Sequence, residues 1–563
     1  MAIPGKTFSQ LTKTATRADL VQGNIAAIET PEGCKKLPLN LLNNGFKIFE
    51  SLEDAILKNA DLTVGDYFET NGFHSSGDGG KATYLVSDIG TPNGKSCILL
   101  NTGKFALLQY GDWVTPDELG YTSNDDVAEF IGFIVDTLRV EHIRLRARTY
   151  YWRTCLNLGS INDFRIKGDG WFGAPRKMTY ISVRPASNIG QMAVIAGKSI
   201  SIENLNIEVT SSDYIKEIDG FKTTSYADNS ILYHSYSHIV MNSFKNCWNY
   251  DGGYKYHLRF DSCYPANSNI GIHFRDSSAM TVEIRNTYFN NLDQYGLWIE
   301  GNMFSCKCAV CNFGSINTGV KLSTASVNQL YQNVTFENSN FEMDTSNENL
   351  EAGFVDCYDV SHPDTRQNLT FIGCHFTLAK ASQPVQSTVR RLIRLGSYSN
   401  VILIGCQLLG KDEPQYPDWQ TYPKLLWNEN YLPSHGSIIE CGNNLFFDYP
   451  DVFLPFVLKN GQSTEILAYG SRGTSPSPVS DCNDWLPDFN GQTKIARVST
   501  FENTVNMPTT GIWGFLYVMG LVEGVNKRVL QMLLASNGNI YTRVIKDTGN
   551  GWVYDPWKTI AAS

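Results

Sequence analysis

The repeat that decides the fold class is NVTFENSNF at 333–341, NLTFIGCHF at 368–376 and NVILIGCQL at 400–408. Each copy has apolar residues at its second, fourth and ninth positions and a small residue at its seventh. Alternation with a period of two is typical of a strand that buries one face, and the two spacers in the middle indicate a corner. Each copy therefore predicts two short strands joined by a corner.

Looser copies extend the pattern from Ser199 to Phe446 and recur every 19 to 39 residues. Their second apolar positions are Ile202, Met241, Phe260, Ile284, Cys308 and Cys441. A repeat that cannot bury its apolar face alone must stack on its neighbours, so we expect a parallel β-solenoid with about 4.8 Å between coils. Residues that tolerate a left-handed backbone stand at the expected corners: Asn204, Asn242, Asn286, Asn338, Gly373 and Gly405.

The composition limits the class of protein. Only 18% of the 563 residues are charged, whereas 28 Tyr and 11 Trp favour a surface that stacks on flat apolar faces such as those of sugars. The net charge of −10 argues against a nucleic-acid partner. No apolar run of about 18 residues occurs, so we expect no membrane insertion. The N-terminus lacks the apolar core of a signal peptide, which indicates synthesis in a cytoplasm.

The cysteines have an odd count of 13, which does not favour disulfides. Free cysteine packs as a small hydrophobe, so we expect an interior ladder of thiols. Four of them share the seventh position of their copies: Cys263, Cys311, Cys374 and Cys406. The alternative is a zinc site at CKCAVC (Cys306, Cys308, Cys311), but no fourth ligand stands in an obvious place. No metal and no other cofactor is predicted.

The region ahead of the coils has two parts. Residues 1–46 are polar and form either a docking segment or a disordered leader. Residues 47–122 form a cap region with one short helix at 51–62 and a glycine loop around Asp78. That loop lacks the Lys-Ser/Thr of a nucleotide-binding loop, so we interpret it as a turn.

A one-sided helix is predicted at 123–139, where SNDDVAEFIGFIVDTLR has apolar residues at helical spacing. Ser123 or Asn124 is its expected N-cap. A helix in this place can cover the open end of the coils, whose strand edges would otherwise be unpaired.

The coil pattern ends near residue 450. Residues 451–485 contain SRGTSPSPVS and are predicted to be a linker with connecting strands. Residues 486–563 alternate again and predict a small antiparallel β domain. It either closes a trimer or binds sugar through Trp552, Tyr554 and Trp557.

A family resemblance emerges from these segments together. The helix with D-D-x-x-x-F, RLRARTYYW at 144–152 and FRIKGDG at 164–170 resemble the pectate-lyase-type right-handed β-helix of bacteriophage tailspikes. The opening at 8–42 and GDYFETNGFHSSGDGGKATYLV at 65–86 resemble the start of capsule depolymerases carried by podoviruses of encapsulated, Klebsiella-type enterobacteria. The resemblance covers most of the chain, and its opening is the more specific part.

The resemblance implies an all-β protein with a right-handed parallel β-helix at 123–450 that carries the catalytic site. It also implies a homotrimeric spike in the virion tail, made in the host cytoplasm and acting outside the host cell. Residues 1–46 would dock to the phage tail or to another tail fibre. The expected substrate is the capsular polysaccharide of the host bacterium.

Outward positions between the apolar ones are expected to align across coils. The first outward position gives Arg259, Glu283, Lys307 and Thr335, and the next gives Asp261, Arg285, Ala309 and Glu337. Adjacent coils would place Glu283 between Arg259 and Lys307, and Asp261 opposite Arg285. These charges form either a solvated ladder of ion pairs or a site that holds acidic sugars.

Glycoside hydrolysis requires two carboxyl groups, one of them near aromatic surface. Two stretches, 246–261 and 290–301, are rich in both acidic and aromatic residues. The predicted acid/base residues are Asp251, Asp261, Glu283 and Glu300. The predicted substrate-binding residues are Trp248, Tyr250, Tyr254, His257, Arg259, Arg285, Trp298 and Lys307. For each aromatic residue, packing against a neighbouring loop or subunit is the alternative.

Two other functions stay open. In a polysaccharide lyase, Tyr256 or His257 would remove the proton next to a uronate carboxylate while Arg259 or Lys307 neutralises it. A receptor-binding fibre would have no catalysis at all. Product analysis separates the three, because hydrolysis yields reducing ends without unsaturation, elimination yields an unsaturated uronate, and a binder yields neither.

Overall fold

The computed structural model describes residues 25–30, 33–38, 47–159, 161–170, 178–224, 233–275, 278–323, 331–344, 354–357, 366–379, 391–395, 398–410, 424–428, 438–441, 456–458, 467–469, 481–483, 493–499, 505–509, 511, 513–523, 526–536, 539–547 and 552–560. The chain divides into two compact units, unit 1 (Met1–Asn269) and unit 2 (Ile270–Ser563). Most of the predicted docking segment and the linker candidate at 471–480 lie outside the described residues. No described helix is long and apolar enough to cross a membrane.

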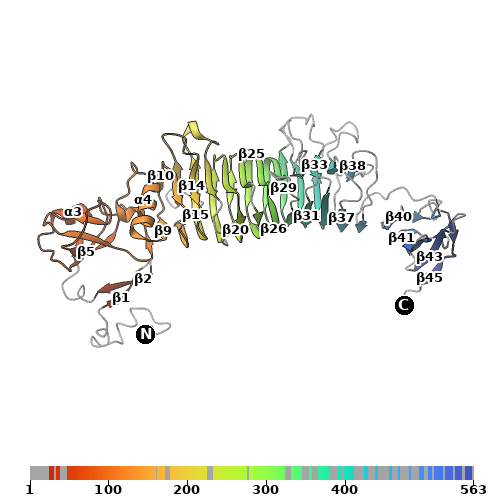
Figure 1. The fold of residues 1–563 in the computed structure, drawn as a ribbon, viewed down its shortest axis with the longest axis horizontal. Coiled ribbons are helices and arrows are strands. Elements are labelled where there is room, and N and C mark those ends of the chain that lie inside the picture. Colours follow the sequence, from red (N-terminus) through yellow and green to blue (C-terminus); the bar gives the residue numbers. More distant parts are fainter. Residues whose placement is uncertain are drawn as a thin grey trace. The chain divides into compact units, whose positions relative to one another are not determined.

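Small elements precede the coils in unit 1 (Figure 1). In the polar segment, β1 (Ile25–Thr30) and β2 (Gly33–Pro38) form an antiparallel hairpin. The sequence pattern did not predict this hairpin. A five-stranded sheet follows, with the strands β3 (Lys47–Phe49), β4 (Tyr67–Thr70), β5 (Ala82–Ser87), β7 (Phe105–Gln109) and β6 (Cys97–Leu99) in that order. The helix predicted at 51–62 is confirmed as α3 (Leu52–Leu57), which Ser51 caps.

The glycine loop around Asp78 is a turn that its own carboxylate holds together. Asp78 accepts hydrogen bonds from the backbone N–H groups of Phe73, His74, Ser75 and Gly80. Burial alone would raise the pKa of Asp78, but these backbone donors lower it below its ordinary value. The donors that could cradle a phosphate are thus already used.

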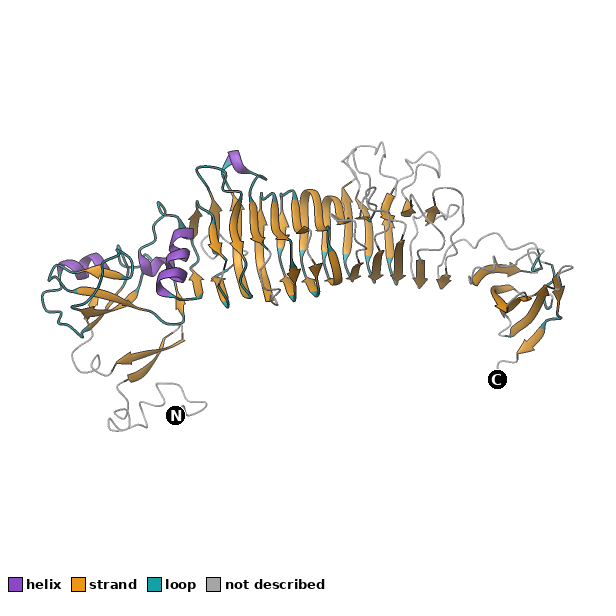
Figure 2. Cartoon of the chain, in the orientation of Figure 1, coloured by secondary structure: helices purple, strands orange, loops and turns teal. Residues whose placement is uncertain are grey.

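The predicted capping helix is confirmed at Val127–Phe133 (α4), and it packs against β10 (Thr149–Trp152) and β11 (Leu156–Leu158) of the coils (Figure 2). The predicted N-cap is wrong, because Asp126 caps the helix by accepting from Ala128 N–H. Asp126 also accepts from Thr154 Oγ1 at 2.6 Å, so it ties the helix to the coil. A π turn, η2 (Ile134–Leu138), ends the helical segment.

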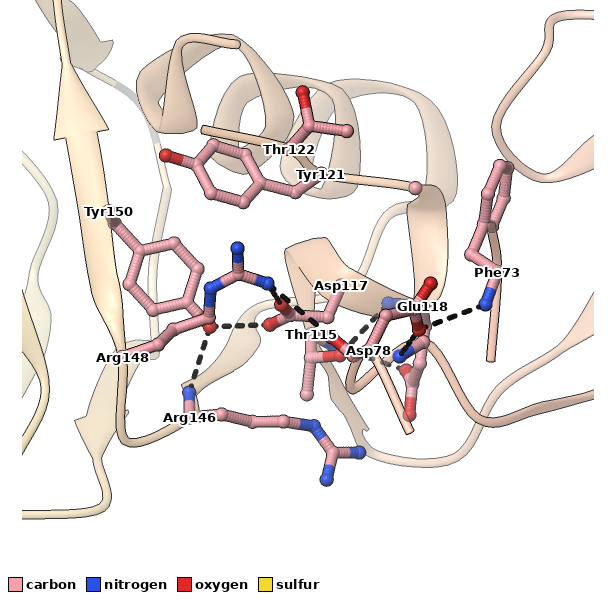
Figure 3. A network of polar contacts seen from close by, with 12 residues as sticks. Phe73, Asp78, Thr115, Asp117, Glu118, Tyr121, Thr122, Arg146, Arg148 and Tyr150 are labelled. Atoms are coloured by element: carbon pink, nitrogen blue, oxygen red, sulfur yellow. Dashed lines mark hydrogen bonds and ion pairs between the residues drawn. The ribbon is translucent and has the colours of Figure 1, made fainter. Parts of the chain in front are cut away.

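A buried polar network joins the cap region to the coils in unit 1 (Figure 3). Asp117, in the 3-10 helix η1 (Pro116–Leu119), accepts from Arg148 at 2.5 Å and from the Tyr150 hydroxyl. The Tyr150 hydroxyl in turn accepts from Arg146 N–H at 3.0 Å. Breaking a buried pair of this kind is costly, so the network fixes the cap region on the coils.

The coils of unit 1 have three parallel faces. The first contains β8 (Trp113–Val114), β9 (His142–Leu145), β12 (Phe164–Gly168), the first halves of β15 (Ser199–Val209) and β17 (Tyr233–Asn242), and β20 (Leu258–Asp261). The second contains β10, β13 (Tyr180–Val183), the second halves of β15 and β17, and β21 (Tyr264–Ala266). The third contains β11, β14 (Gln191–Ile195), β16 (Asp219–Thr223) and β18 (Asn246–Asp251). The remaining elements are η3 (Ser212–Tyr214) and β19 (Tyr254–Lys255).

The coils of unit 2 also have three parallel faces. The first contains β24 (Val282–Arg285), β26 (Asn302–Ala309), β28 (Tyr331–Glu337), β31 (Arg366–Ile372), β34 (Tyr398–Ile404), β37 (Ile438–Cys441) and β39 (Leu467–Tyr469), with β23 (Ser278–Ala279) beside the start of β26. The second contains the first halves of β25 (Tyr288–Ile299) and β27 (Asn312–Leu322), then β29 (Asn340–Asp344), β32 (His375–Ala379) and β35 (Gln407–Gly410). The third contains β22 (Ile270–Arg275), the second halves of β25 and β27, β30 (Val355–Asp356), β33 (Arg391–Leu395), β36 (Lys424–Asn428) and β38 (Phe456–Leu458).

The predicted β-helix is confirmed by the register of the repeats. Phe336 pairs with Phe371 and Phe371 with Leu403, so the apolar positions form a column. The rings of Phe336 and Phe371 stack 5.0 Å apart. Five of the six predicted corner residues adopt a left-handed backbone, but at the remaining corner Ser243 does so in place of Asn242.

The seventh position of the repeat holds small hydrogen-bond donors. The buried thiols of Cys374 and Cys406 donate to the carbonyls of Phe336 and Phe371 on the preceding coil, both at 3.4 Å. Ser339 Oγ does the same to the Cys308 carbonyl at 3.4 Å. The predicted interior thiol ladder is confirmed at its described positions, and its thiols also bond neighbouring coils.

The predicted C-terminal antiparallel sheet is confirmed. Its strands are β40 (Thr493–Ser499), β41 (Trp513–Glu523), β42 (Asn526–Ala535), β43 (Ile540–Asp547), β44 (Trp552–Tyr554) and β45 (Lys558–Ile560). Trp552, Tyr554 and Trp557 pack against its core. The guanidinium of Arg543 lies 4.4 Å from the ring centre of Trp557 and 5.4 Å from that of Tyr554, so an internal cation occupies one face of each ring.

Candidate functional site

One register position on the third face of unit 2 carries polar or aromatic side chains on five successive coils. The pairing of β22, β25, β27, β30 and β33 places them in a row: His273, Trp298, Lys321, Asp356 and Arg394. The flanking residues of each strand point into the apolar core, as Leu297 and Ile299 do on either side of Trp298. The row therefore points away from the core.

The row is buried although it lies outside the core. The exposed fraction of the side chain is 7% for His273, 15% for Lys321, 10% for Asp356 and 7% for Arg394. Ionisable groups are rarely buried unless they are paired, because desolvation costs several kcal/mol for each ion. A desolvated row of charges is therefore the feature of the coils that most needs a functional explanation.

His273, Trp298 and Glu300 form the first half of this site. The imidazole Nε2 of His273 lies 2.8 Å from Oε2 of Glu300, which follows β25 directly. The rings of His273 and Trp298 stack 4.2 Å apart with 6° between their planes. The indole N–H of Trp298 donates to Ser323 Oγ at 2.9 Å. Glu300 and both rings are thus held in one orientation.

Lys321, Asp356 and Arg394 form the second half. Lys321 Nζ lies 2.5 Å from Asp356 Oδ2, and Arg394 Nη1 lies 4.0 Å from the same oxygen. Asp356 therefore lies between two cations on adjacent coils, in a place with little solvent. Its carboxylate can act on a ligand only in concert with these cations.

An interior amide holds the corner that carries Glu300. Gln332, fully buried in β28, donates from Nε2 to the carbonyls of Ile299, Gly301 and Ser323 at 3.2, 3.1 and 2.7 Å. Two of these carbonyls flank Glu300 in the chain. The backbone on both sides of Glu300 is thus fixed from inside the coil.

The two carboxyl groups lie on different coils. Two coil steps separate β25, which ends before Glu300, from β30, which carries Asp356. Two steps correspond to about 10 Å along the coils. Glu300 is also offset by two residues from the register position of Asp356, about 7 Å along the strand, so the two backbones are about 12 Å apart. An inverting pair of carboxyl groups needs about 6.5 to 9.5 Å, so these side chains must extend toward each other to reach it.

Two of the predicted sugar platforms are wrong. Trp248 and Tyr250 are 0% and 1% exposed, because both rings point into the coil interior of unit 1. Trp248 packs edge-on against Phe260 at 5.4 Å, and Tyr250 does so at 6.2 Å. The aromatic density of this stretch thus reflects the core.

The other predicted residues of the stretch 246–257 lie nearer the surface. Asp251 pairs with Lys222 at 3.4 Å. Tyr254 is 49% exposed. His257 is exposed and stacks on Tyr233 with 5.0 Å between ring centres. These residues stay candidates for contact with a ligand.

The predicted charged residues of the first face form surface ion pairs. Arg259 pairs with Asp261 and Arg285 with Glu283, both at 3.1 Å and within one strand. The register of Glu283 with Lys307 is confirmed, but Lys307 forms its ion pair with Glu337 at 2.7 Å. Exposed pairs of this kind contribute up to about 1 kcal/mol. Their geometry matches the solvated-ladder alternative.

Sequence reasoning identified Trp298 in the row and Glu300 beside it, but missed the other members of the row. The missed residues are His273, Lys321, Asp356 and Arg394. Each stands between apolar neighbours, as Lys321 does in VKL and Arg394 in IRL, so a charge interrupts a buried strand. That signal was available, but the register that aligns the charges spans intervals of 23 to 38 residues without a shared motif.

Comparison with known proteins gives no match to any family model and none to a curated protein. Among solved structures, the tailspike protein of Acinetobacter phage vB_ApiP_P1 matches with 14% identity over 91% of this chain and 90% of its own, with a TM-score of 0.47. The enzymatically active domain of bacteriophage CBA120 tailspike protein 4 matches with 12% identity over 89% and 68%, with a TM-score of 0.49. The tailspike of Acinetobacter baumannii bacteriophage Fri1, a capsular polysaccharide depolymerase, matches with 12% identity over 92% of both chains, with a TM-score of 0.39.

Proposed function

We propose that this chain is a phage tailspike that binds and depolymerises the capsular polysaccharide of its bacterial host. The observation that carries the proposal is the buried row on the third face of unit 2, with the carboxyl group of Asp356, two cations and a stacked indole, together with the carboxyl group of Glu300 beside it. The sequence resemblance of the capping helix and the coils to phage tailspikes, and that of the opening to capsule depolymerases, support the same function.

Hydrolysis is the reaction we propose first. Glu300, whose carboxyl contacts His273 beside the indole of Trp298, would donate a proton to the glycosidic oxygen. Asp356, two coils away, would activate the attacking water. Of the residues predicted from sequence, Glu300 and Trp298 keep their proposed roles, whereas Asp251, Asp261 and Glu283 are weaker candidates because their carboxylates form exposed ion pairs.

Elimination is the second candidate, and the contact between His273 and Glu300 favours it. A histidine oriented by a carboxylate can remove the proton next to a uronate carboxylate, while Lys321 and Arg394 neutralise that carboxylate. The residues that the sequence predicts for this role are Tyr256, His257, Arg259 and Lys307. They lie outside the row, so an elimination that uses His273 takes place on the third face without them.

Assembly as a homotrimer is part of the proposal. The outward positions of the first face change from charged residues in β24 and β26 to Thr370 and Ile372 in β31 and to Ile402 and Ile404 in β34. Ile404 is 40% exposed. An apolar outer surface suits contact with a second copy of the chain. We further propose that the N-terminal segment attaches the spike to the virion tail or to another fibre, and that the C-terminal sheet closes the trimer.

Product analysis on purified capsular polysaccharide tests the function. We expect the purified chain to shorten the polymer and to release reducing ends without ultraviolet absorbance from an unsaturated uronate. Appearance of that absorbance would replace hydrolysis by elimination. Retention of the full polymer length, with binding intact, would leave a non-catalytic receptor-binding fibre and overturn the enzymatic proposal.

A further inference from the structure

The core-facing side of the C-terminal sheet contains a guanidinium without a counter-ion. Arg543, in β43, is 6% exposed. Its Nε–H donates to Gln531 Oε1 at 2.7 Å, but its Nη2 is buried without a hydrogen-bond partner. The charge of Asp481 acts on Arg543, yet this carboxylate accepts from Asn483 N–H and Asn506 Nδ2, and no described carboxylate forms an ion pair with Arg543. Burial therefore lowers the pKa of Arg543 from its ordinary value.

A second unsatisfied group lies beside this guanidinium. Asn483 Oδ1 is buried without a hydrogen-bond partner. The carbonyl of the preceding residue, Cys482, accepts from Gln531 Nε2 at 2.8 Å, and the carbonyl of Asn483 accepts from the Tyr554 hydroxyl at 3.1 Å. Gln531 and Tyr554 are also the neighbours of Arg543. One place thus has a donor and an acceptor whose burial is not offset by any hydrogen bond within the described chain.

Two aromatic rings frame the guanidinium and lead to the surface. Arg543 lies 4.4 Å from the ring centre of Trp557 and 5.4 Å from that of Tyr554. The indole N–H of Trp557 donates to the Asn506 carbonyl at 2.9 Å, so this ring has a fixed orientation. Trp557 belongs to the segment 555–557 between β44 and β45, whose residues are half-buried or exposed. A ligand at the edge of this segment therefore meets an indole, a cation and an amide oxygen together.

We propose that Arg543, Asn483 and Trp557 bind a sugar acid of the uronate class. A guanidinium pairs with a carboxylate through charge-assisted hydrogen bonds, so the sugar carboxylate supplies the missing counter-ion and a partner for Nη2. A ring hydroxyl donates to Asn483 Oδ1, and the indole contacts the apolar face of the sugar. The inference rests on the proposed function for the source of the sugar, a unit of the capsular polysaccharide. A second contact outside the buried row would raise the avidity for that polymer.

Fluorine NMR of the full chain labelled with 5-fluorotryptophan tests the site, with the Trp557 resonance identified as the one that Trp557→Phe removes. We expect sodium glucuronate to shift this resonance saturably, with a dissociation constant on the order of 10⁻³ M for a single sugar, and D-glucose to bind at least about tenfold more weakly. Sodium acetate that binds as tightly as glucuronate would overturn the sugar and indicate an acidic side chain of a second copy. An unshifted resonance would overturn the site and leave water as the partner of both buried groups.

Removal of the cation should abolish the glucuronate response. Arg543→Gln is expected to reduce the shift to that caused by D-glucose. Lys546→Gln is the matched control, because it removes an exposed cation of the same strand that already pairs with Asp555 at 3.0 Å; this variant should respond as the native chain does. An undiminished response in Arg543→Gln would refute the site. The measurement involves no cleavage, so its result is independent of whether the chain is an enzyme.

A second variant keeps the proposal testable if Arg543→Gln does not fold. Asn483→Ala removes an oxygen that has no partner in the described chain and leaves the backbone bonds to Asp481 and Tyr554 in place. We expect the thermal midpoint not to fall, because no hydrogen bond is lost, while glucuronate binds about tenfold more weakly. An unchanged affinity for glucuronate in this variant would exclude Asn483 from the site and overturn the proposal.

Discussion

Two faces of the coils in unit 2 carry charged rows that differ in their solvent exposure. On the first face, Lys307 and Glu337 form an ion pair with side chains 40% and 30% exposed. On the third face, Lys321 and Asp356 form a pair that is 15% and 10% exposed. Both pairs connect adjacent coils at short distance. Burial therefore distinguishes the candidate site from the structural ladder, and residue type and spacing do not.

The largest expected effect is on catalysis. Glu300→Gln and Asp356→Asn should each lower the rate of capsule cleavage by about 10² to 10⁴, the range for a lost general acid or base. Glu337→Gln, which removes an exposed carboxylate that pairs with a lysine in the same way, should leave the rate nearly unchanged. Initial rates of polymer shortening measure all three. A similar loss in all variants would erase the proposed difference between the faces.

The second effect is on stability. Lys321→Met leaves Asp356 buried without its nearest cation and should lower the free energy of unfolding by about 3 to 5 kcal/mol. Lys307→Met breaks an exposed pair and should cost at most about 1 kcal/mol. Urea unfolding, followed through the transition in which unit 2 unfolds, measures both free energies. Equal costs would mean that the exposed fractions do not govern the energetics of these rows.

A fully buried ionisable residue in unit 1, His234, extends the comparison of exposed and buried charges. Burial lowers the pKa of His234 to about 4, and the charge of Lys255 lowers it further. Between pH 6.5 and about 4, the unfolded chain therefore binds a proton that the folded chain does not. The contribution of neutral His234 to the free energy of unfolding is fully present above pH 6.5, and it is lost as the pH falls to about 4.

That loss amounts to about 3 kcal/mol. His234→Gln keeps a donor for the Gly197 carbonyl, which His234 Nε2 now contacts at 2.9 Å. We expect the thermal midpoint of this variant to fall less between pH 7 and pH 4.5 than that of the native chain. Parallel profiles for the two proteins would show that His234 is not the buried group that titrates.

A smaller effect is expected from the interior amide of Gln332. Gln332→Met removes the amide that holds the backbone around Glu300 and should lower kcat about tenfold with little change in KM, because the carboxyl moves while the rest of the row stays. Gln367→Met removes the neighbouring amide, which contacts Gln332 but none of these carbonyls, and serves as the control. Equal kcat values in both variants would reduce Gln332 to a purely structural role.

The fold could be predicted from the sequence because the repeat itself carries the stacking information. The period of two, the corner residues and the inward column from Phe336 to Leu403 all follow from local pattern. The site could be predicted only at Trp298 and Glu300. Its other members join them through the register of strands 23 to 38 residues apart, and that register depends on loop lengths that no local pattern determines. Trp248 and Tyr250 are not recognisable as core residues for another reason, because β18 is buried at five successive positions and its inward side does not show as an alternation.

The smallest effect concerns the seventh position of the repeat, where the sequence showed a small residue but not its hydrogen bond. Cys374→Ser keeps a donor to the Phe336 carbonyl, as Ser339 does for Cys308 one coil earlier. Cys374→Val has a similar size but no donor, so it leaves that carbonyl without its thiol partner and should cost about 1 kcal/mol more than the serine variant. Urea unfolding ranks the two. If the valine variant is the more stable, apolar volume and not the bond between coils selects the residue at this position, and the thiol ladder would be a packing feature only.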